Sequence, residues 1–202
     1  MNFIVLASTL ILGVFVAFSI KNSDFKQENT EQTFWAKEKK SNFVRKKSLE
    51  HLNYISIPQS LLFMQPQNPT AQTLSYLQDL NALSSLKIVN LTGISNTDLK
   101  LEYGTANITV LTEYDTHYTQ MVTILQKLAE CLVASGDTAL AIEVLEFAIS
   151  TGSDVSKSYL LLAELYKEVG TSQKIAFLVK QAEGMQSLMK NSILRSLKAS
   201  GE

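Results

Sequence analysis

Few residues of this chain could carry out chemistry, and they do not form a catalytic set. His51 and His117 lie in different segments, and neither stands at a metal-ligand spacing from Cys131. Cys131 is the single cysteine, which excludes an intramolecular disulfide. Its apolar helical surroundings favour a buried structural thiol over a nucleophile. No phosphate-binding glycine loop, nucleophile elbow or HExxH pattern occurs. We therefore expect a protein that is not an enzyme and that has no metal or other cofactor.

The densest carboxylates near a histidine are Asp98, Glu102, Glu113 and Asp115, around His117. An acid/base pair would need one of them within hydrogen-bond reach of a reacting group. A solvated loop face explains these side chains more simply, because charged residues are mostly exposed.

The first segment of the chain, Phe3 to Ile20, is almost wholly apolar. As a helix it would rise about 27 Å, close to the ~30 Å hydrocarbon core of a bilayer. The sequence therefore predicts a transmembrane anchor over residues 1–20. A cleaved signal peptide is the alternative, but the basic region that begins such peptides is missing. Small residues four apart on one face of the anchor, Thr9, Gly13 and Ala17, could pair two copies in a homodimer.

The net charge of −1 is unevenly divided along the chain. Residues 21–50 carry eight Lys/Arg against five Asp/Glu, whereas residues 51–202 carry ten against fourteen. The positive-inside rule then predicts a single-pass protein of the cell membrane whose C-terminal domain is cytoplasmic. The membrane-proximal basic residues are Lys37, Lys39, Lys40, Arg45, Lys46 and Lys47. They fit either a solvated helix face or attraction to anionic lipid. We do not expect nucleic acid as a partner, because the following domain is acidic.

Four parts follow from composition and periodicity: the anchor over 1–20, a basic juxtamembrane helix over 21–50, a connector over 51–69, and a helical domain over 70–202. All three prolines lie in the connector. Thr70 can cap the first helix of the domain, which we expect to reach about Leu86. The expected fold class is all-α, an N-terminal transmembrane helix followed by helical hairpins.

The most specific pattern is a self-match at a period of 34 residues. Five of eight matched pairs are identical, and the other three keep apolar or aromatic bulk. The pairs are Leu125/Tyr159, Leu128/Leu162, Ala129/Ala163, Glu130/Glu164, Leu132/Tyr166, Gly136/Gly170, Leu145/Val179 and Ala148/Ala182. Alanine at the same place in each unit indicates a close helix crossing, and glycine indicates a left-handed helix end.

This order of residues resembles the tetratricopeptide repeat over about residues 122–189, with repeats at 122–155 and 156–189. Leu125 stands where that pattern favours Trp, and Ser153 and Ser187 replace its closing Pro. A generic antiparallel helical bundle is the alternative. The whole layout also resembles small membrane-anchored bacterial proteins with no assigned activity. The segments that carry this second resemblance are 44–49, 52–58 and 90–104.

The resemblance implies a partner-binding groove lined by first-helix side chains, namely Gln126, Glu130, Val133, Leu160, Glu164 and Lys167. Chaperone-binding members of the family use a Lys/Asn clamp for a terminal carboxylate, and Glu130 and Glu164 stand at its Asn position. We therefore expect a membrane-anchored scaffold or adaptor whose protein partner is not an acidic tail. The alternatives are an extracytoplasmic envelope-associated structural protein, or an accessory subunit of a membrane enzyme complex.

Overall fold

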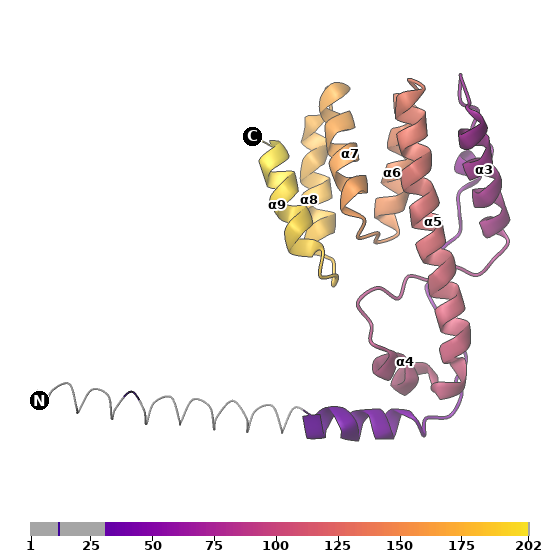
Figure 1. Ribbon diagram of the computed structural model, residues 1–202, viewed down its shortest axis with the longest axis vertical. Helices are drawn as coiled ribbons and strands as arrows, with labels where there is room; N and C mark the ends of the chain where they lie inside the picture. Colours follow the sequence, from indigo (N-terminus) through magenta and orange to yellow (C-terminus); the bar gives the residue numbers. More distant parts are fainter. Residues whose placement is uncertain (1–11, 13–30, 202) are drawn as a thin grey trace, which may run out of the picture. The chain divides into compact units, whose positions relative to one another are not determined.

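The computed structural model describes residue 12 and residues 31–201, and this part of the chain is all-helical (Figure 1). One isolated antiparallel bridge, between Tyr54 and Val89, is the only β-type pairing among these residues. The chain divides into two compact units. Residues 31–47 and 95–108 form the described part of the first unit, which we call the clip. Residues 48–94 and 109–201 form the second unit, which we call the helical-pair unit.

The helical-pair unit begins with two helices that precede the repeat. They are α2 (Gln59–Leu62) and α3 (Ala71–Ser84). Thr70 caps α3 as the sequence predicts, because its side-chain oxygen accepts from the Thr73 N–H at 3.1 Å. Leu61 of α2 and Leu80 of α3 are buried in the same hydrophobic core as the later helices.

The remaining helices of this unit form successive pairs. They are α5 (Ile108–Ala134, whose first residue belongs to the clip), α6 (Thr138–Ser150), α7 (Ser156–Glu168), α8 (Ile175–Glu183, preceded by a 3-10 turn, Ser172–Lys174) and α9 (Lys190–Gly201). In Figure 1, α5, α7 and α9 stand in one layer, with α6 and α8 behind them. This arrangement is compatible with a helical-repeat domain.

Both hairpins turn in the same way, 34 residues apart. Gly136 and Gly170 have φ of 85° and 71°, in the left-handed region that glycine adopts readily. After Gly136, the Asp137 N–H donates to the Leu132 carbonyl at 2.8 Å. The equivalent bond after Gly170 joins Thr171 to Tyr166 at 2.7 Å. These are the same helix-ending motif, and it satisfies carbonyls that the helix leaves unpaired.

The core explains why alanine recurs at the matched positions. Ala129 and Ala163 are fully buried, and so are the larger residues that flank them, such as Leu128 and Leu162. A small side chain lets two helix backbones approach, and the larger neighbours fill the space on either side.

The described part of the clip is formed by two segments that are distant in sequence, residues 31–47 and residues 95–108. Residues 31–41 are helical, and residues 44–47 have no regular structure. The clip also contains α4 (Asn96–Tyr103) and a 3-10 turn, Thr105–Asn107. The basic helix expected over 21–50 therefore ends at residue 41, and its first ten residues lie outside the described part. The connector expected over 51–69 contains α2 and contributes Ile57, Leu61 and Met64 to the core.

The structure corrects the predicted membrane architecture. Along residue 12 and residues 31–201, no helix is both long enough and apolar enough to cross a bilayer. Only α5, with 27 residues, is long in this part, but it carries Glu113, Asp115 and Lys127 and buries its apolar face in the core. The predicted transmembrane fold class and single-pass location at the cell membrane are therefore wrong. The expected anchor over 1–20, with Thr9, Gly13 and Ala17, lies outside the described residues except for Leu12.

Candidate binding surface

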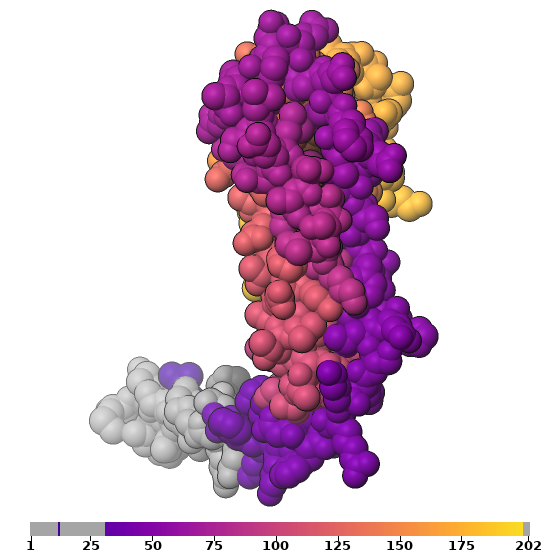
Figure 2. Space-filling model, turned by 90° about the vertical axis from the view of Figure 1, so that its right-hand side faces the viewer, coloured from indigo at the N-terminus to yellow at the C-terminus, as the bar shows by residue number. Residues whose placement is uncertain are grey.

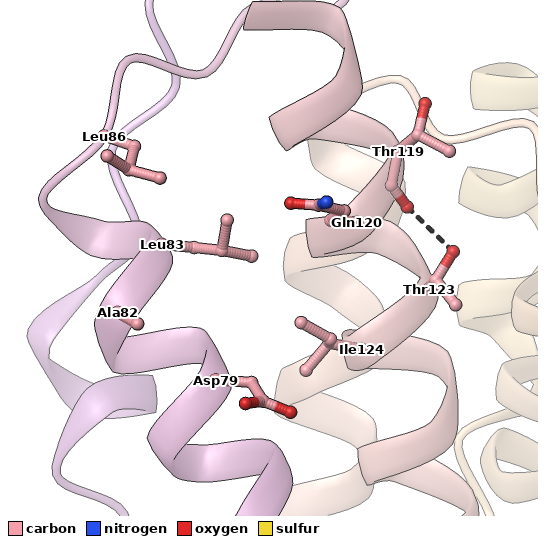
Figure 3. Close-up of a pocket in the computed structure, with 8 residues that line it drawn as sticks. All are labelled: Asp79, Ala82, Leu83, Leu86, Thr119, Gln120, Thr123 and Ile124. Carbon is pink, nitrogen blue, oxygen red and sulfur yellow. Dashed lines mark hydrogen bonds between the residues drawn. The ribbon is translucent and has the colours of Figure 1, made fainter. Parts of the chain in front are cut away.

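A groove lies between α3 and α5 in the helical-pair unit (Figure 3). Its volume is about 460 Å³. Its α3 side is lined by Asp79, Ala82, Leu83 and Leu86, and its α5 side by Thr119, Gln120, Thr123 and Ile124. Figure 2 shows the face of this unit that α2 and α3 cover, in purple.

The groove results from the side-chain sizes at the α3–α5 contact. Leu80 and Leu83 of α3 are buried in the core and hold this helix against the rest of the unit. Ala82 is too short to fill the adjacent space, and Ile124 reaches into it from α5 (Figure 3). Leu86 at the rim keeps 44% of its surface exposed. The result is an apolar hollow with Asp79 as its charged lining residue.

The first-helix positions expected to bind a partner do not all face outward. Gln126 is only 7% exposed, and the Ser158 hydroxyl of α7 donates to its side-chain oxygen at 2.5 Å. The Gln126 amide in turn donates to Glu130 at 3.0 Å. Gln126 therefore joins α5 to α7, and a partner would meet Glu130 beside it.

The other expected positions remain on the surface. Glu130, Glu164 and Lys167 are exposed, and Val133 and Leu160 are half-buried. Thr119, Thr123 and Glu130 lie on one stripe of α5, because residues four and seven apart share a helix face. Thr119 and Thr123 of this stripe line the groove, whereas Glu130 accepts from Gln126, which is bonded to Ser158 of α7. The groove therefore extends the surface that the sequence predicts.

The α3 half of the groove was not expected from the sequence. Leu77, Leu80 and Leu83 show that α3 is amphipathic, but periodicity does not say which helix it packs against. α3 lies outside the 34-residue register, so the repeat could not place it either. Spacing in the sequence therefore gives no signal for this groove.

The residues first considered for chemistry have structural roles or are dispersed. His117 Nδ1 lies 2.9 Å from the Lys87 carbonyl oxygen, and Asp115 accepts from the Leu91 N–H at 3.0 Å. Cys131 is partly buried and His51 is exposed. Among the described residues, no three His, Cys, Asp or Glu side chains are grouped to hold a metal ion.

Shifted pKa values in the helical-pair unit also have structural causes. Burial raises the pKa of the Tyr118 hydroxyl to about 12, and that hydroxyl donates to the Thr151 carbonyl at 3.4 Å. Burial acts to raise the pKa of Glu146, but hydrogen bonds from Tyr166 at 2.7 Å and Lys174 at 2.9 Å lower it below its usual value. These contacts join α6 to α7 and to the turn before α8.

The basic residues singled out in the sequence belong to the clip, and they divide into two groups. Lys37 pairs with Asp98 at 2.6 Å, and Lys47 donates to the Leu101 carbonyl near the end of α4 at 3.3 Å. The others, namely Lys39, Lys40, Arg45 and Lys46, are exposed.

Comparison of the chain with protein-family models, curated proteins and solved structures found no match. Its function therefore has to be inferred from the geometry of its own residues.

Proposed function

We propose that the helical-pair unit is a non-catalytic protein-binding module of the tetratricopeptide-repeat type, acting as a scaffold or adaptor. Its partner is a protein segment that has apolar side chains and little net negative charge. The segment lies along the exposed stripe of α5 and inserts an apolar side chain between α3 and α5.

The repeat type is supported by the register of the helices. α5 and α7 end 34 residues apart, at Ala134 and Glu168, and the helical turns that follow begin 34 residues apart, at Thr138 and Ser172. Stacked pairs of this kind offer an extended surface formed by their first helices.

The observation that carries the binding function is the apolar groove between α3 and α5. Its volume of about 460 Å³ accommodates large apolar side chains, and Leu86 and Ile124 offer them contact. An aromatic or aliphatic anchor in such a hollow supplies most of the binding energy in many interfaces.

The charge expected of the partner follows from one carboxylate that lines the groove and from two others that are exposed on the first helices of the pairs. Asp79 lines the groove, and Glu130 and Glu164 are exposed at matched positions on α5 and α7. A neutral or basic segment gains from this field, whereas an acidic one meets like-charge repulsion. Lys127 and Lys167 are also exposed on these helices, so the surface is mixed in charge and the apolar anchor dominates affinity.

A peptide-display selection against the intact chain tests the proposal. We expect enriched peptides to contain an aromatic or large aliphatic residue and to be neutral or basic. Ala82→Trp places an indole in the groove and should weaken their binding by at least about tenfold, the equivalent of about 1.4 kcal/mol. Glu130→Lys with Glu164→Lys should weaken the basic peptides selectively.

Ala71→Trp is the matched control, because Ala71 is also an exposed alanine of α3 but does not line the groove. It should leave binding unchanged, and all variants should keep the helical circular-dichroism signal. Enrichment of acidic peptides, or binding that tolerates Ala82→Trp, would contradict the proposed site.

A further inference from the structure

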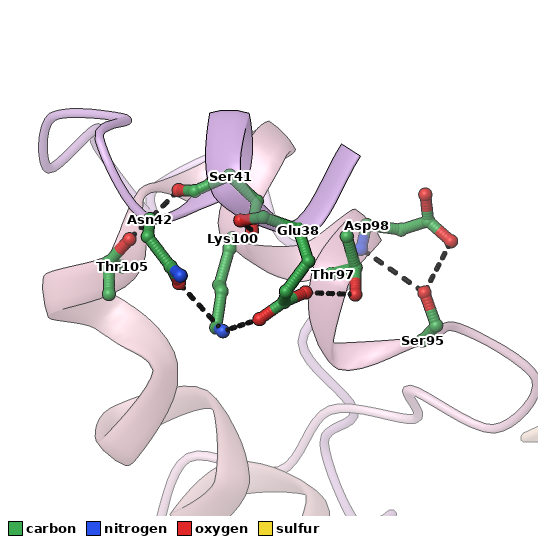
Figure 4. Close-up of polar contacts among 8 residues, drawn as sticks. All are labelled: Glu38, Ser41, Asn42, Ser95, Thr97, Asp98, Lys100 and Thr105. Atoms are coloured by element: carbon green, nitrogen blue, oxygen red, sulfur yellow. Dashed lines mark hydrogen bonds and ion pairs between the residues drawn. The ribbon is translucent and has the colours of Figure 1, made fainter. Parts of the chain in front are cut away.

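The clip uses its carboxylates internally (Figure 4). The Glu38 carboxylate forms an ion pair with Lys100 and accepts a hydrogen bond from the Thr97 hydroxyl at 2.5 Å. The Asp98 carboxylate forms an ion pair with Lys37 at 2.6 Å and accepts a hydrogen bond from the Ser95 hydroxyl at 2.6 Å. Both carboxylates, and the two lysines that they pair with, therefore join the helical segment 31–41 to α4.

Five cations of the described part of the clip remain outside these ion pairs, and one of them, Lys47, donates to the Leu101 carbonyl at 3.3 Å. The described part of the clip has seven Lys/Arg and four Asp/Glu. Among the described residues, Lys39, Lys40, Arg45 and Lys46 have no carboxylate within ion-pair distance, and all four are exposed. The positive charge of the clip is thus concentrated on one short stretch, residues 39–46.

Large aromatic side chains stand in and beside the same stretch. Phe43 is 79% exposed, Trp35 65% and Phe34 51%. Trp35 and Lys39 lie four residues apart in one helical segment and so share a face. Exposed aromatics of this size next to cations are a common composition of binding surfaces, in which they act as anchors.

The backbone that carries the last two cations is held in place. The Lys47 N–H donates to the Tyr103 carbonyl at 3.0 Å, and the Thr105 N–H donates to the Val44 carbonyl at 3.3 Å. The Asn107 side-chain amide donates to the Lys47 carbonyl at 2.8 Å. Arg45 and Lys46 are therefore displayed from a fixed segment, which lowers the entropy lost on binding.

We infer that residues 34–46 of the clip form a second binding surface, which takes an acidic protein segment that also carries apolar side chains. Carboxylates of the segment pair with Lys39, Lys40, Arg45 and Lys46, and its apolar side chains contact Phe43 and Trp35. This surface shares no residue with the α3–α5 groove and has the opposite charge preference, so the inference does not depend on the proposed function.

The small number of unpaired cations favours an acidic protein segment over nucleic acid as the ligand. Four free cations are fewer than the six to ten phosphate contacts typical of duplex binding.

Trp35 is the only tryptophan of the chain and provides a built-in probe. A peptide of alternating Glu and Leu, titrated into the intact protein, should shift or quench Trp35 emission, and added salt should weaken this response. Reversing Lys39, Lys40, Arg45 and Lys46 to Glu should raise the Kd by at least about tenfold. Reversing Lys127, Lys157, Lys180 and Lys198, four exposed lysines of the other unit, should leave it unchanged.

Three results would overturn the inference: no response to the acidic peptide, an equal response to a Lys–Leu peptide, or an unchanged Kd after reversal of the four clip cations. Tighter binding of single- or double-stranded DNA than of the peptide would assign the surface to nucleic acid instead. If the reversed protein loses helical circular dichroism, the four Gln replacements and Phe43→Ser serve as milder variants, with the same expected loss of binding.

Discussion

At the scale of single residues, Gly104 is the position where the clip depends most on one amino acid. Its φ of 88° and ψ of 148° lie close to a region that only glycine adopts readily. A Cβ atom there would overlap the Arg45 carbonyl and lie 2.9 Å from the Lys46 Cα. We predict that Gly104→Ala destabilises the clip by more than about 1 kcal/mol, because the steric overlap adds to the backbone strain. Hydrogen exchange of residues 31–47 and 95–108, followed by mass spectrometry, measures this loss.

Gly136→Ala is the matched control for Gly104→Ala. Gly136 also has a positive φ, of 85°, but a Cβ there meets no atom within 4 Å. Its substitution should cost only the backbone strain, about 1–2 kcal/mol, and should leave exchange in the clip unchanged. If both variants show similar hydrogen-exchange rates in the clip, the close approach of Arg45 to Gly104 does not determine the stability of the clip.

At the scale of helices, the prediction concerns the two alanines at matched crossings. Ala129 and Ala163 are fully buried, so Ala129→Leu or Ala163→Leu should overpack a helix crossing and lower the free energy of unfolding by about 1–3 kcal/mol. Ala36→Leu, at an exposed position of the helical segment 31–41, should have little effect. Thermal or denaturant unfolding measures all three. If either core variant is as stable as Ala36→Leu, the 34-residue register does not describe how these helices pack.

At the scale of the whole molecule, we predict that the two units respond to acid differently. Hydrogen bonding and charge from Lys100 lower the pKa of Glu38, and Lys37 does the same for Asp98. Their stabilising effect is complete above the ordinary values of 4.5 and 3.8, and it is lost as the pH falls through the lowered values. The clip should therefore loosen on acidification while the apolar core still holds the helical pairs.

Trp35 emission reports on the clip, and far-ultraviolet circular dichroism reports mainly on the helical-pair unit. The emission change should come first as the pH is lowered from neutral. Glu38→Gln keeps the side-chain shape but removes one titrating partner, so it should make the emission change less dependent on pH. Coincident transitions by both probes, in the unaltered chain, would show that the clip does not open on its own.

The sequence by itself determined the local features of this protein. The all-helical class, the cap at Thr70, the helix ends at Gly136 and Gly170, and the buried alanines all follow from patterns within about 34 residues. Such patterns are readable because caps, turns and helix faces depend on near neighbours in the chain. The predicted transmembrane fold class was wrong, because no helix along residue 12 and residues 31–201 is long and apolar enough to cross a bilayer, and the expected anchor over 1–20 lies outside the described residues except for Leu12.

Only the tertiary structure decided which surfaces are available for binding. The groove exists because α3 packs on α5, a pairing that no repeat register specifies. Gln126, expected to face a partner, is covered by Ser158, which lies 32 residues later. Lys100 pairs with Glu38 across 62 residues, and this leaves the cations of residues 39–46 free. Contacts of this kind depend on how helices meet in space, so residue spacing alone could not give them.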